Sequence, residues 1–188
     1  MSELNLTTDE KKILLQTARK SIESRLFAKM VDYPEPTPTL HENCGAFVTL
    51  HLKNNLRGCI GYVTGIKPLF ETVKEIAQAA AFSDPRFPTL SRDEFPKIEI
   101  EISVLSPLMK INDFNKIEVG KHGLMVHKGI YSGLLLPQVA TEYHWNRDQF
   151  LSHTCQKAGL SPHAWKTEKL DVEIFTALVF NERELGLI

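Results

Sequence analysis

The residues best suited to chemistry in this chain lie in one short stretch, residues 56–61, with the sequence Leu-Arg-Gly-Cys-Ile-Gly. If this stretch forms a β-strand, Arg57 and Cys59 lie on the same face, about 6–7 Å apart along the strand. A guanidinium at that distance favours the thiolate form of a cysteine, and the thiolate is the nucleophilic form. The spacing therefore predicts a reactive thiol at Cys59 beside an anion-binding group at Arg57.

Two glycines, Gly58 and Gly61, lie within two positions of Cys59. Because glycine has no β-carbon, the backbone there can approach a ligand closely, or can bulge so that Cys59 points into a cleft. Free cysteine is also among the most buried residue types and often packs as a small, inert hydrophobic side chain. The residues alone leave both interpretations of Cys59 open, a nucleophile in a ligand site or a core residue.

A second candidate segment is the loop at residues 84–88, which reads Asp-Pro-Arg-Phe-Pro. Its two prolines restrict the backbone, so we expect an ordered loop that holds Arg86 near Asp84 or near Cys59. Asp84, Arg86 and Phe87 are then candidate binding residues around Cys59. The alternative is that an Asp84–Arg86 turn only pins the end of the preceding helix.

His122 is the candidate acid–base residue, because the glycines at positions 120 and 123 leave it accessible. A neutral imidazole can accept a proton from a thiol. If the fold brings His122 to Cys59, the two residues form a thiolate–imidazolium pair, with Arg57 as the anion clamp. The other interpretation is that His122 satisfies a carbonyl group of its own turn.

Five sequence words occur in order along the chain: GAFVTL at 45–50, LRGCIG at 56–61, AAFSDPRFP at 80–88, GKHGL at 120–124 and LLLPQV at 134–139. In these words the chain, from about residue 4 to residue 182, resembles the AMMECR-domain family, also called AmmeMemoRadiSam system protein A. The resemblance implies an α+β domain with antiparallel sheet in two lobes, and a biochemical activity that is not settled. It also implies a role in a modification pathway, with Memo-like and radical-SAM proteins as partners.

The composition is that of an ordinary globular chain of 188 residues, 43% hydrophobic and 24% charged. The 22 basic and 23 acidic side chains give a formal net charge of −1, so no basic excess indicates a nucleic-acid partner. The N-terminus lacks a signal-peptide pattern, and no run approaches the ~18 apolar residues of a membrane span. We therefore expect a cytoplasmic protein with neither a membrane nor a nucleic acid as its partner.

The spacing of cysteines and histidines predicts neither a metal site nor a cofactor. The three cysteines form no Cys-x-x-Cys pattern, and none of the seven histidines lies in a His-Glu-x-x-His motif. The glycines between positions 120 and 133 lack dinucleotide or P-loop spacing, and no serine lies in Gly-x-Ser-x-Gly. The chemistry that remains is centred on Cys59.

The elements that must position Cys59 are predicted from periodicity and from capping signals. A capping box of Thr7 and Glu10 starts a helix over residues 8–30, and a Pro-rich linker at 33–39 follows that could bridge two lobes. Two strands then form a hairpin that turns at residues 54–55 and places Cys59 late in its second strand. A helix from Pro68 follows and ends near residue 83, before Pro85.

The second half of the chain predicts a short helix after residue 91, a strand at 98–104 and a hairpin over 124–136. A helix between Asn146 and Gly159 buries Cys155, and a final strand covers 170–180. We therefore predict one domain over residues 1–188, of the α+β class, in which antiparallel sheets are flanked by helices and form two lobes.

The function predicted from these residues is a cleft around Cys59 that binds a small anionic or peptide-like ligand, with cysteine-dependent chemistry on that ligand. The alternative is a non-catalytic adaptor that binds other proteins. An accessible and unusually acidic Cys59 favours the first function, whereas a buried Cys59 together with an exposed apolar patch elsewhere favours the second.

Overall fold

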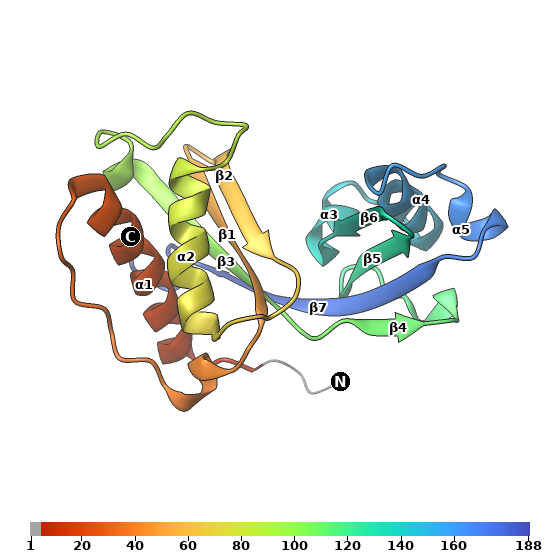
Figure 1. Cartoon of the computed structure of the whole chain (residues 1–188), viewed down its shortest axis with the longest axis horizontal. Helices are drawn as coiled ribbons and strands as arrows, with labels where there is room; N and C mark the ends of the chain where they lie inside the picture. Colours follow the sequence, from red (N-terminus) through yellow and green to blue (C-terminus); the bar gives the residue numbers. More distant parts are fainter. Residues whose placement is uncertain (1–4) are drawn as a thin grey trace. The chain divides into compact units, whose positions relative to one another are not determined.

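The computed structural model describes residues 5–188, which divide into two compact units. The large unit contains residues 5–105 and 178–188, and the small unit contains residues 106–177. The long strand β7 (Asp171–Asn181) contributes residues to both units (Figure 1). Helices and antiparallel strands occur in both units, which confirms the predicted α+β class.

The large unit is built on an antiparallel sheet whose centre is β1 (Gly45–Leu52). On one side β1 pairs with β2 (Asn55–Tyr62), and on the other side it pairs with β3 (Ile98–Leu105), which lies next to β7. The turn between β1 and β2 uses positive φ at Lys53 and Asn54, one position earlier than predicted. The predicted hairpin is confirmed, and it places Cys59 in an edge strand.

Two helices, α1 (Thr8–Phe27) and α2 (Leu69–Phe82), lie side by side on one face of this sheet (Figure 1). The predicted capping box forms at the start of α1, and α2 ends at Ser83 as predicted. The buried core of the unit consists of apolar side chains from both helices and from one face of the strands, among them Leu14, Ile22, Val48, Leu50, Val73, Ile76, Ile100 and Ile102. Because strand side chains alternate, Thr49 and its same-face neighbours point to the opposite face.

Two shorter elements complete the large unit. The first is the 3₁₀ helix η1 (Pro38–His41), and the second is the 3₁₀ helix η2 (Phe95–Lys97), which forms where a short α-helix was predicted. Ser91 and Glu94 still make the predicted reciprocal bonds, since the Ser91 amide donates to Glu94 Oε2 and the Glu94 amide donates to Ser91 Oγ.

The Pro-rich segment at residues 33–39 lies entirely within the large unit, between α1 and β1. The interpretation that it bridges two lobes is therefore wrong. The chain passes between the units at 105–106 and again at 177–178. Thr37 at the end of the segment donates a hydrogen bond to Glu10 at 2.7 Å, which ties the segment back to the start of α1.

The small unit contains the strands β4 (Met109–Ile111), β5 (His122–Lys128), β6 (Tyr131–Leu135) and the first part of β7. β5 pairs with β6 and β7, and β4 pairs with β7, all antiparallel. Its helices are η3 (Phe114–Lys116), α3 (Pro137–Glu142), α4 (Arg147–Lys157) and α5 (Ala164–Thr167). Cys155 of α4 is fully buried, as predicted. Among residues 5–188, no helix combines the length and the apolar character needed to cross a membrane.

Candidate functional site

Cys59 is the most accessible of the three cysteines. Its side chain is partly exposed, whereas Cys44 is 8% exposed and Cys155 is 0% exposed. Burial raises the pKa of both Cys44 and Cys155, which keeps these two thiols protonated near neutral pH. The partial exposure of Cys59 agrees with the accessibility expected of a ligand site, which is one of the two conditions set for that function.

The backbone of Cys59 is fixed by the loop that follows α2. The Cys59 N–H donates to Asp84 Oδ2 at 2.9 Å, and Arg86 Nη2 donates to the Cys59 carbonyl oxygen at 3.2 Å. β2 is at the edge of the sheet, so these outward groups would otherwise need another partner. The two side chains therefore take the place of a neighbouring strand at this one residue, and we call Asp84 and Arg86 the edge clip.

The edge clip is itself an ion pair. Arg86 Nη2 lies 2.7 Å from Asp84 Oδ2, and Arg86 Nε donates to Asp84 Oδ1 at 3.0 Å. Hydrogen bonds from Arg86 hold the pKa of the buried Asp84 carboxyl well below its usual range, with the amides of Cys59 and Arg86 acting in the same direction. The predicted proximity of Arg86 to Asp84 and Cys59 is confirmed, and the role of these residues in binding stays a prediction.

Arg86 places a positive charge beside Cys59, through its hydrogen bond to the Cys59 carbonyl oxygen. Its hydrogen bond to Asp84 raises the pKa of Arg86, and the charge of an ionised Cys59 adds to that effect. The Arg86 side chain is 54% exposed, and its Nη1 makes no hydrogen bond to any residue between 5 and 188. One face of a fixed guanidinium is therefore available to an anion beside Cys59.

Arg57 does not have the position that the strand pattern predicted. The β1–β2 register shifts between Leu50 and His51, so that Leu50 pairs with Gly58 and His51 pairs with Leu56. Arg57 is thus the extra residue of a β-bulge, and a bulge interrupts the alternation on which the prediction depended.

The Arg57 side chain instead forms a partly buried ion pair. Its Nε donates to Glu94 Oε1 at 2.8 Å, and its Nη2 donates to Glu94 Oε2 at 3.1 Å and to the Thr89 carbonyl oxygen at 3.3 Å. Arg57 is 7% exposed, and its hydrogen bonds lower the pKa of Glu94 to about 2. The expectation that Arg57 is a free anion clamp beside the thiol is corrected, because its guanidinium is buried and bonded to Glu94 and Thr89.

The two glycines have packing roles. A β-carbon on Gly58 would lie 2.2 Å from the carbonyl oxygen of Ala80, so glycine lets β2 approach α2 closely. A β-carbon on Gly61 would lie 2.3 Å from the carbonyl oxygen of Ala46 and 2.4 Å from the ring of Phe47. At both glycines, the close backbone approach that was predicted is an approach to other atoms of the protein.

Phe87 lies between the two arginines of this region. Its ring centroid is 5.5 Å from the guanidinium carbon of Arg86 and 6.0 Å from that of Arg57. Contacts of this kind between a cation and an aromatic ring are attractive. Phe87 therefore holds the loop against both guanidinium groups.

His122 lies in β5 of the small unit and supports its own turn. It is 3% exposed, and its Nδ1 accepts the backbone N–H of Glu118 at 3.1 Å. This agrees with the interpretation that His122 satisfies a turn, although the partner is an amide N–H where a carbonyl was expected. Its predicted accessibility is wrong, because the flanking glycines do not prevent its burial. The candidate site is therefore built from residues of the large unit.

Thr49 was missed by the sequence interpretation. It lies opposite Cys59 on β1, and its hydroxyl donates to Cys59 Sγ at 3.2 Å. On the other side Thr49 lies opposite Glu101 of β3, so a thiol, a hydroxyl and a carboxylate occupy one row across three strands. Alternation could place Thr49 and Glu101 on the wet faces of their strands, but only the register between strands brings them into line with Cys59.

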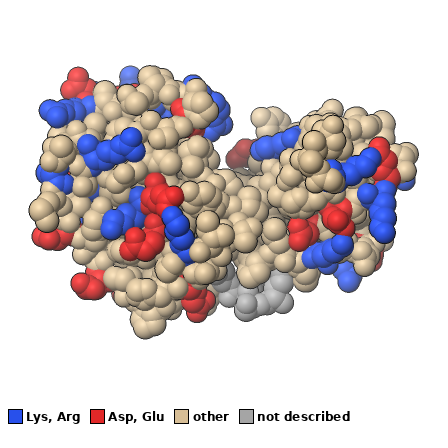
Figure 2. All heavy atoms as spheres, in the orientation of Figure 1, with Lys and Arg blue, Asp and Glu red and all other residues tan. Residues whose placement is uncertain are grey.

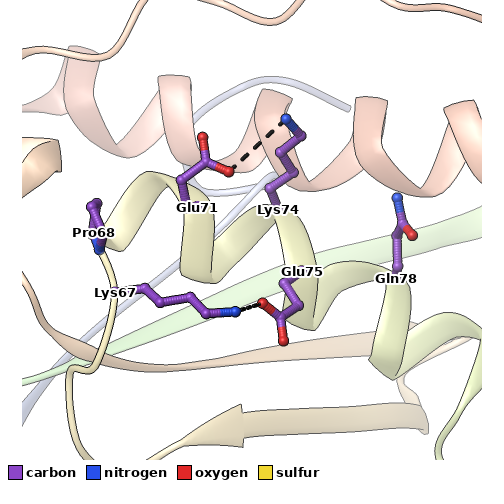
Figure 3. A pocket seen from close by; sticks show the side chains of 6 residues that line it. All are labelled: Lys67, Pro68, Glu71, Lys74, Glu75 and Gln78. Atoms are coloured by element: carbon purple, nitrogen blue, oxygen red, sulfur yellow. Dashed lines mark hydrogen bonds and ion pairs between the residues drawn. The ribbon is translucent and has the colours of Figure 1, made fainter.

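Elsewhere among the described residues, the side chains form a groove on α2 but no metal-binding cluster. Between residues 5 and 188, no group of three or more His, Cys, Asp or Glu side chains is arranged to hold a metal. A groove of about 440 Å³ lies on the outer side of α2 (Figure 3), lined by Lys67, Pro68, Glu71, Lys74, Glu75 and Gln78. Within it Lys67 pairs with Glu75, and Lys74 lies 4.0 Å from Glu71, so its charges are already matched.

The surface charge gives no sign of a nucleic-acid site on the face that Figure 2 shows. Lysine and arginine side chains are interspersed there with aspartate and glutamate on both units. Proteins that bind nucleic acid usually carry a basic patch or stripe. The mixed pattern agrees with the formal net charge of −1.

Comparison with known proteins gives relatives over nearly the whole chain. The AMMECR1 family model matches residues 15–180. Protein MK0488 of Methanopyrus kandleri is 45% identical over 95% of this chain and 91% of its own length, and Protein PH0010 of Pyrococcus horikoshii is 45% identical over 90% and 88%. The crystal structure of PH0010, which is described as uncharacterised, matches with a TM-score of 0.85 at 42% identity, covering 94% of this chain and 93% of that chain. The chain thus belongs to the AMMECR1 family, as its sequence words indicated.

Proposed function

We propose that this protein binds a small anionic or peptide-like ligand at Cys59, with the thiol in contact with the ligand and Arg86 as the anion-binding group. The observation that carries the proposal is the edge clip, which fixes the backbone of the accessible cysteine and holds a half-exposed guanidinium next to it. In this role Arg86 replaces Arg57, because the Arg86 side chain is 54% exposed whereas the Arg57 side chain is buried against Glu94.

The edge clip suits anion binding because its geometry is set before a ligand arrives. Asp84 already orients the guanidinium through two hydrogen bonds, so little side-chain entropy is lost when an anion binds. The planar fork of arginine also matches a carboxylate or a phosphate better than a lysine does. A ligand with one such group and one part that reaches the sulfur fits this arrangement.

The thiol supports cysteine-dependent chemistry on that ligand, with Cys59 as the nucleophile. The thiolate is the reactive form of cysteine. The Thr49 hydroxyl donates a hydrogen bond to Cys59 Sγ and so fixes the position of the sulfur. An adduct mass retained on Cys59 after native purification would identify the electrophile.

The anion-binding part of the proposal is tested with two alkylating probes that differ in charge. Iodoacetate is an anion and iodoacetamide is neutral, so the ratio of their rate constants at Cys59 reports the local positive charge and cancels the accessibility of the thiol. We expect this ratio to exceed the ratio for an N-acetylcysteine amide, and to fall several-fold in Arg86→Gln and at high salt.

The matched control is Arg92→Gln, which removes an exposed arginine that lies outside the edge clip. It should leave the ratio unchanged. A ratio equal to that of the free thiol, or an equal fall in both variants, would count against an anion site at Cys59.

A second proposal is an adaptor that binds Memo-like or radical-SAM proteins, as the family resemblance implies. Its support is a set of large apolar side chains that are strongly exposed, namely Met30, Ile66 and Ile130. Native co-purification followed by mass spectrometry separates the two proposals. A retained small molecule supports the ligand site, whereas a retained protein whose binding survives Cys59→Ala supports the adaptor.

A further inference from the structure

The ring of His122 holds together the turn at residues 118–122, just before β5. The Glu118 N–H donates to His122 Nδ1 at 3.1 Å, and the His122 N–H donates to the Glu118 carbonyl oxygen at 2.9 Å. Because Nδ1 accepts a hydrogen bond, the neutral ring carries its proton on Nε2. Nε2 is buried and has no hydrogen-bond partner between residues 5 and 188. The closed turn therefore fits the neutral ring.

A second proton on this ring would have to enter at Nδ1, where the Glu118 N–H already points. Two donors would then face each other, and the hydrogen bond that closes the turn would be lost. Burial lowers the pKa of His122, and the charge of Lys121 acts in the same direction, against the Glu118 carboxylate and the Lys116 carbonyl. The closed turn and the charged ring are therefore mutually exclusive.

The charges close to the ring come from its own turn. Glu118 and Lys121 act on it, and they pair with each other at 3.2 Å. Opposite His122, β7 presents the uncharged Thr176, and α3 reaches the turn through the methyl group of Thr141, next to Gly120.

The remaining titratable groups of the neighbouring elements do not compete with His122. The titratable residue of α3, Glu142, is exposed, and the one buried on α4 is Cys155, which stays neutral because burial raises its pKa. The second histidine of β5, His127, is half-exposed, five positions further along, and contacts Glu173 at 3.3 Å. Residues five apart on a strand point to opposite faces.

We propose that the turn at 118–122 is an acid-sensitive latch, which opens when His122 takes up a proton and releases the Glu118 amide. The direction of the pH effect follows from the difference in proton affinity between the open turn and the closed turn. The open turn binds the proton near the ordinary histidine value of about 6.5, whereas the closed turn binds it less readily, because burial lowers the pKa of His122 there. Opening is therefore favoured as the pH falls below about 6.5, by up to tenfold per pH unit, and the turn is closed above it.

The latch is tested by amide hydrogen exchange, measured by NMR on the whole chain and expressed as protection factors at Glu118 and His122. In the native protein these factors should fall at least tenfold between pH 7.5 and pH 5. In His122→Asn they should stay constant, because the asparagine Oδ1 can accept the same N–H and does not titrate. His127→Asn is the matched control, and it should behave as the native protein does.

Since His122→Asn could fail to fold, the ring of the native protein provides a second measurement. The NMR titration of the His122 Cε1–H group should run in parallel with the loss of protection at Glu118. Constant protection across this pH range, or the same fall in His122→Asn as in the native protein, would overturn the proposal. Loss of the latch would leave the ligand site at Cys59 unaffected, because that site uses other residues.

Discussion

Arg57 and Glu94 form a two-bonded ion pair at the edge of the sheet that carries Cys59, with Nε to Oε1 at 2.8 Å and Nη2 to Oε2 at 3.1 Å. The pair joins the bulge of β2 to the turn that precedes η2. It gives the arginine two positions before the candidate nucleophile a structural partner. The Arg57 guanidinium therefore holds β2 against residues 89–94, the segment that follows the loop of the edge clip.

The first prediction follows from this pair. An exposed arginine that only clamped a ligand would tolerate lysine with little change in stability, whereas an arginine held in this partly buried pair would not. A lysine cannot make the two parallel bonds to Glu94 together with the bond to Thr89, so Arg57→Lys should lower the free energy of unfolding by about 1–3 kcal/mol. Urea unfolding measures this change. Arg92→Lys, at an exposed position, should change it by less than about 0.5 kcal/mol.

Features set by neighbouring residues could be predicted from the sequence, whereas features set by strand register, such as the position of Arg57, could not. The capping box of Thr7 and Glu10 is local, because both partners lie within one helical turn, and it was predicted correctly. The bulge at Arg57 depends on how β2 registers against β1, and its partner Glu94 is 37 positions away. A one-residue slip changes the face of every following side chain, and no local pattern specifies it.

The candidate site shows the same division. The Asp84–Arg86 interaction was predictable, because two prolines confine a short loop with opposite charges. The role of Thr49 depends on strand pairing, and the burial of His122 depends on packing in the small unit, so neither could be derived from spacing. The elements β4 and α3, of three and six residues, are too short to leave a periodic signal.

The second prediction concerns thiol reactivity in the native protein. Iodoacetamide near pH 7 should label Cys59 before Cys44 and Cys155, because Cys59 is accessible and burial keeps the other two thiols protonated. Peptide mapping by mass spectrometry after short exposures gives the three rates. In urea the rates should converge. Equal native rates at Cys59 and Cys155 would remove Cys59 as the nucleophile.

The third prediction is a dependence of stability on acid pH through Glu94. Its pKa is about 2 in the folded protein and 4.5 as the ordinary value, so the unfolded chain binds the proton more readily. The stabilisation is present above about pH 4.5 and is lost as the pH falls toward 2. Melting temperatures between pH 6 and pH 3 should fall less steeply in Glu94→Gln than in the native protein. Glu184→Gln, at an exposed position, should follow the native curve.

The last prediction separates the Thr49 hydroxyl from the shape of its side chain. The hydroxyl donates to Cys59 Sγ at 3.2 Å, and a hydrogen bond to a charged group contributes about 1.5 kcal/mol or more, which corresponds to about tenfold in rate. Thr49→Val keeps the volume and removes the donor, so iodoacetamide should alkylate Cys59 up to tenfold more slowly near pH 7.5. Thr49→Ser keeps the donor and should retain the native rate.

The pH dependence of alkylation in the same variants tests the physical reason. If the hydroxyl acts through the charge of the sulfur, the rates of the native protein and Thr49→Val should converge at a pH high enough to ionise every thiol. If Thr49→Val stays slow at high pH, the side chain acts by shaping access to the sulfur. If Thr49→Ser is as slow as Thr49→Val, the hydroxyl is not the active group, and the row from Cys59 to Glu101 is a feature of the sheet alone.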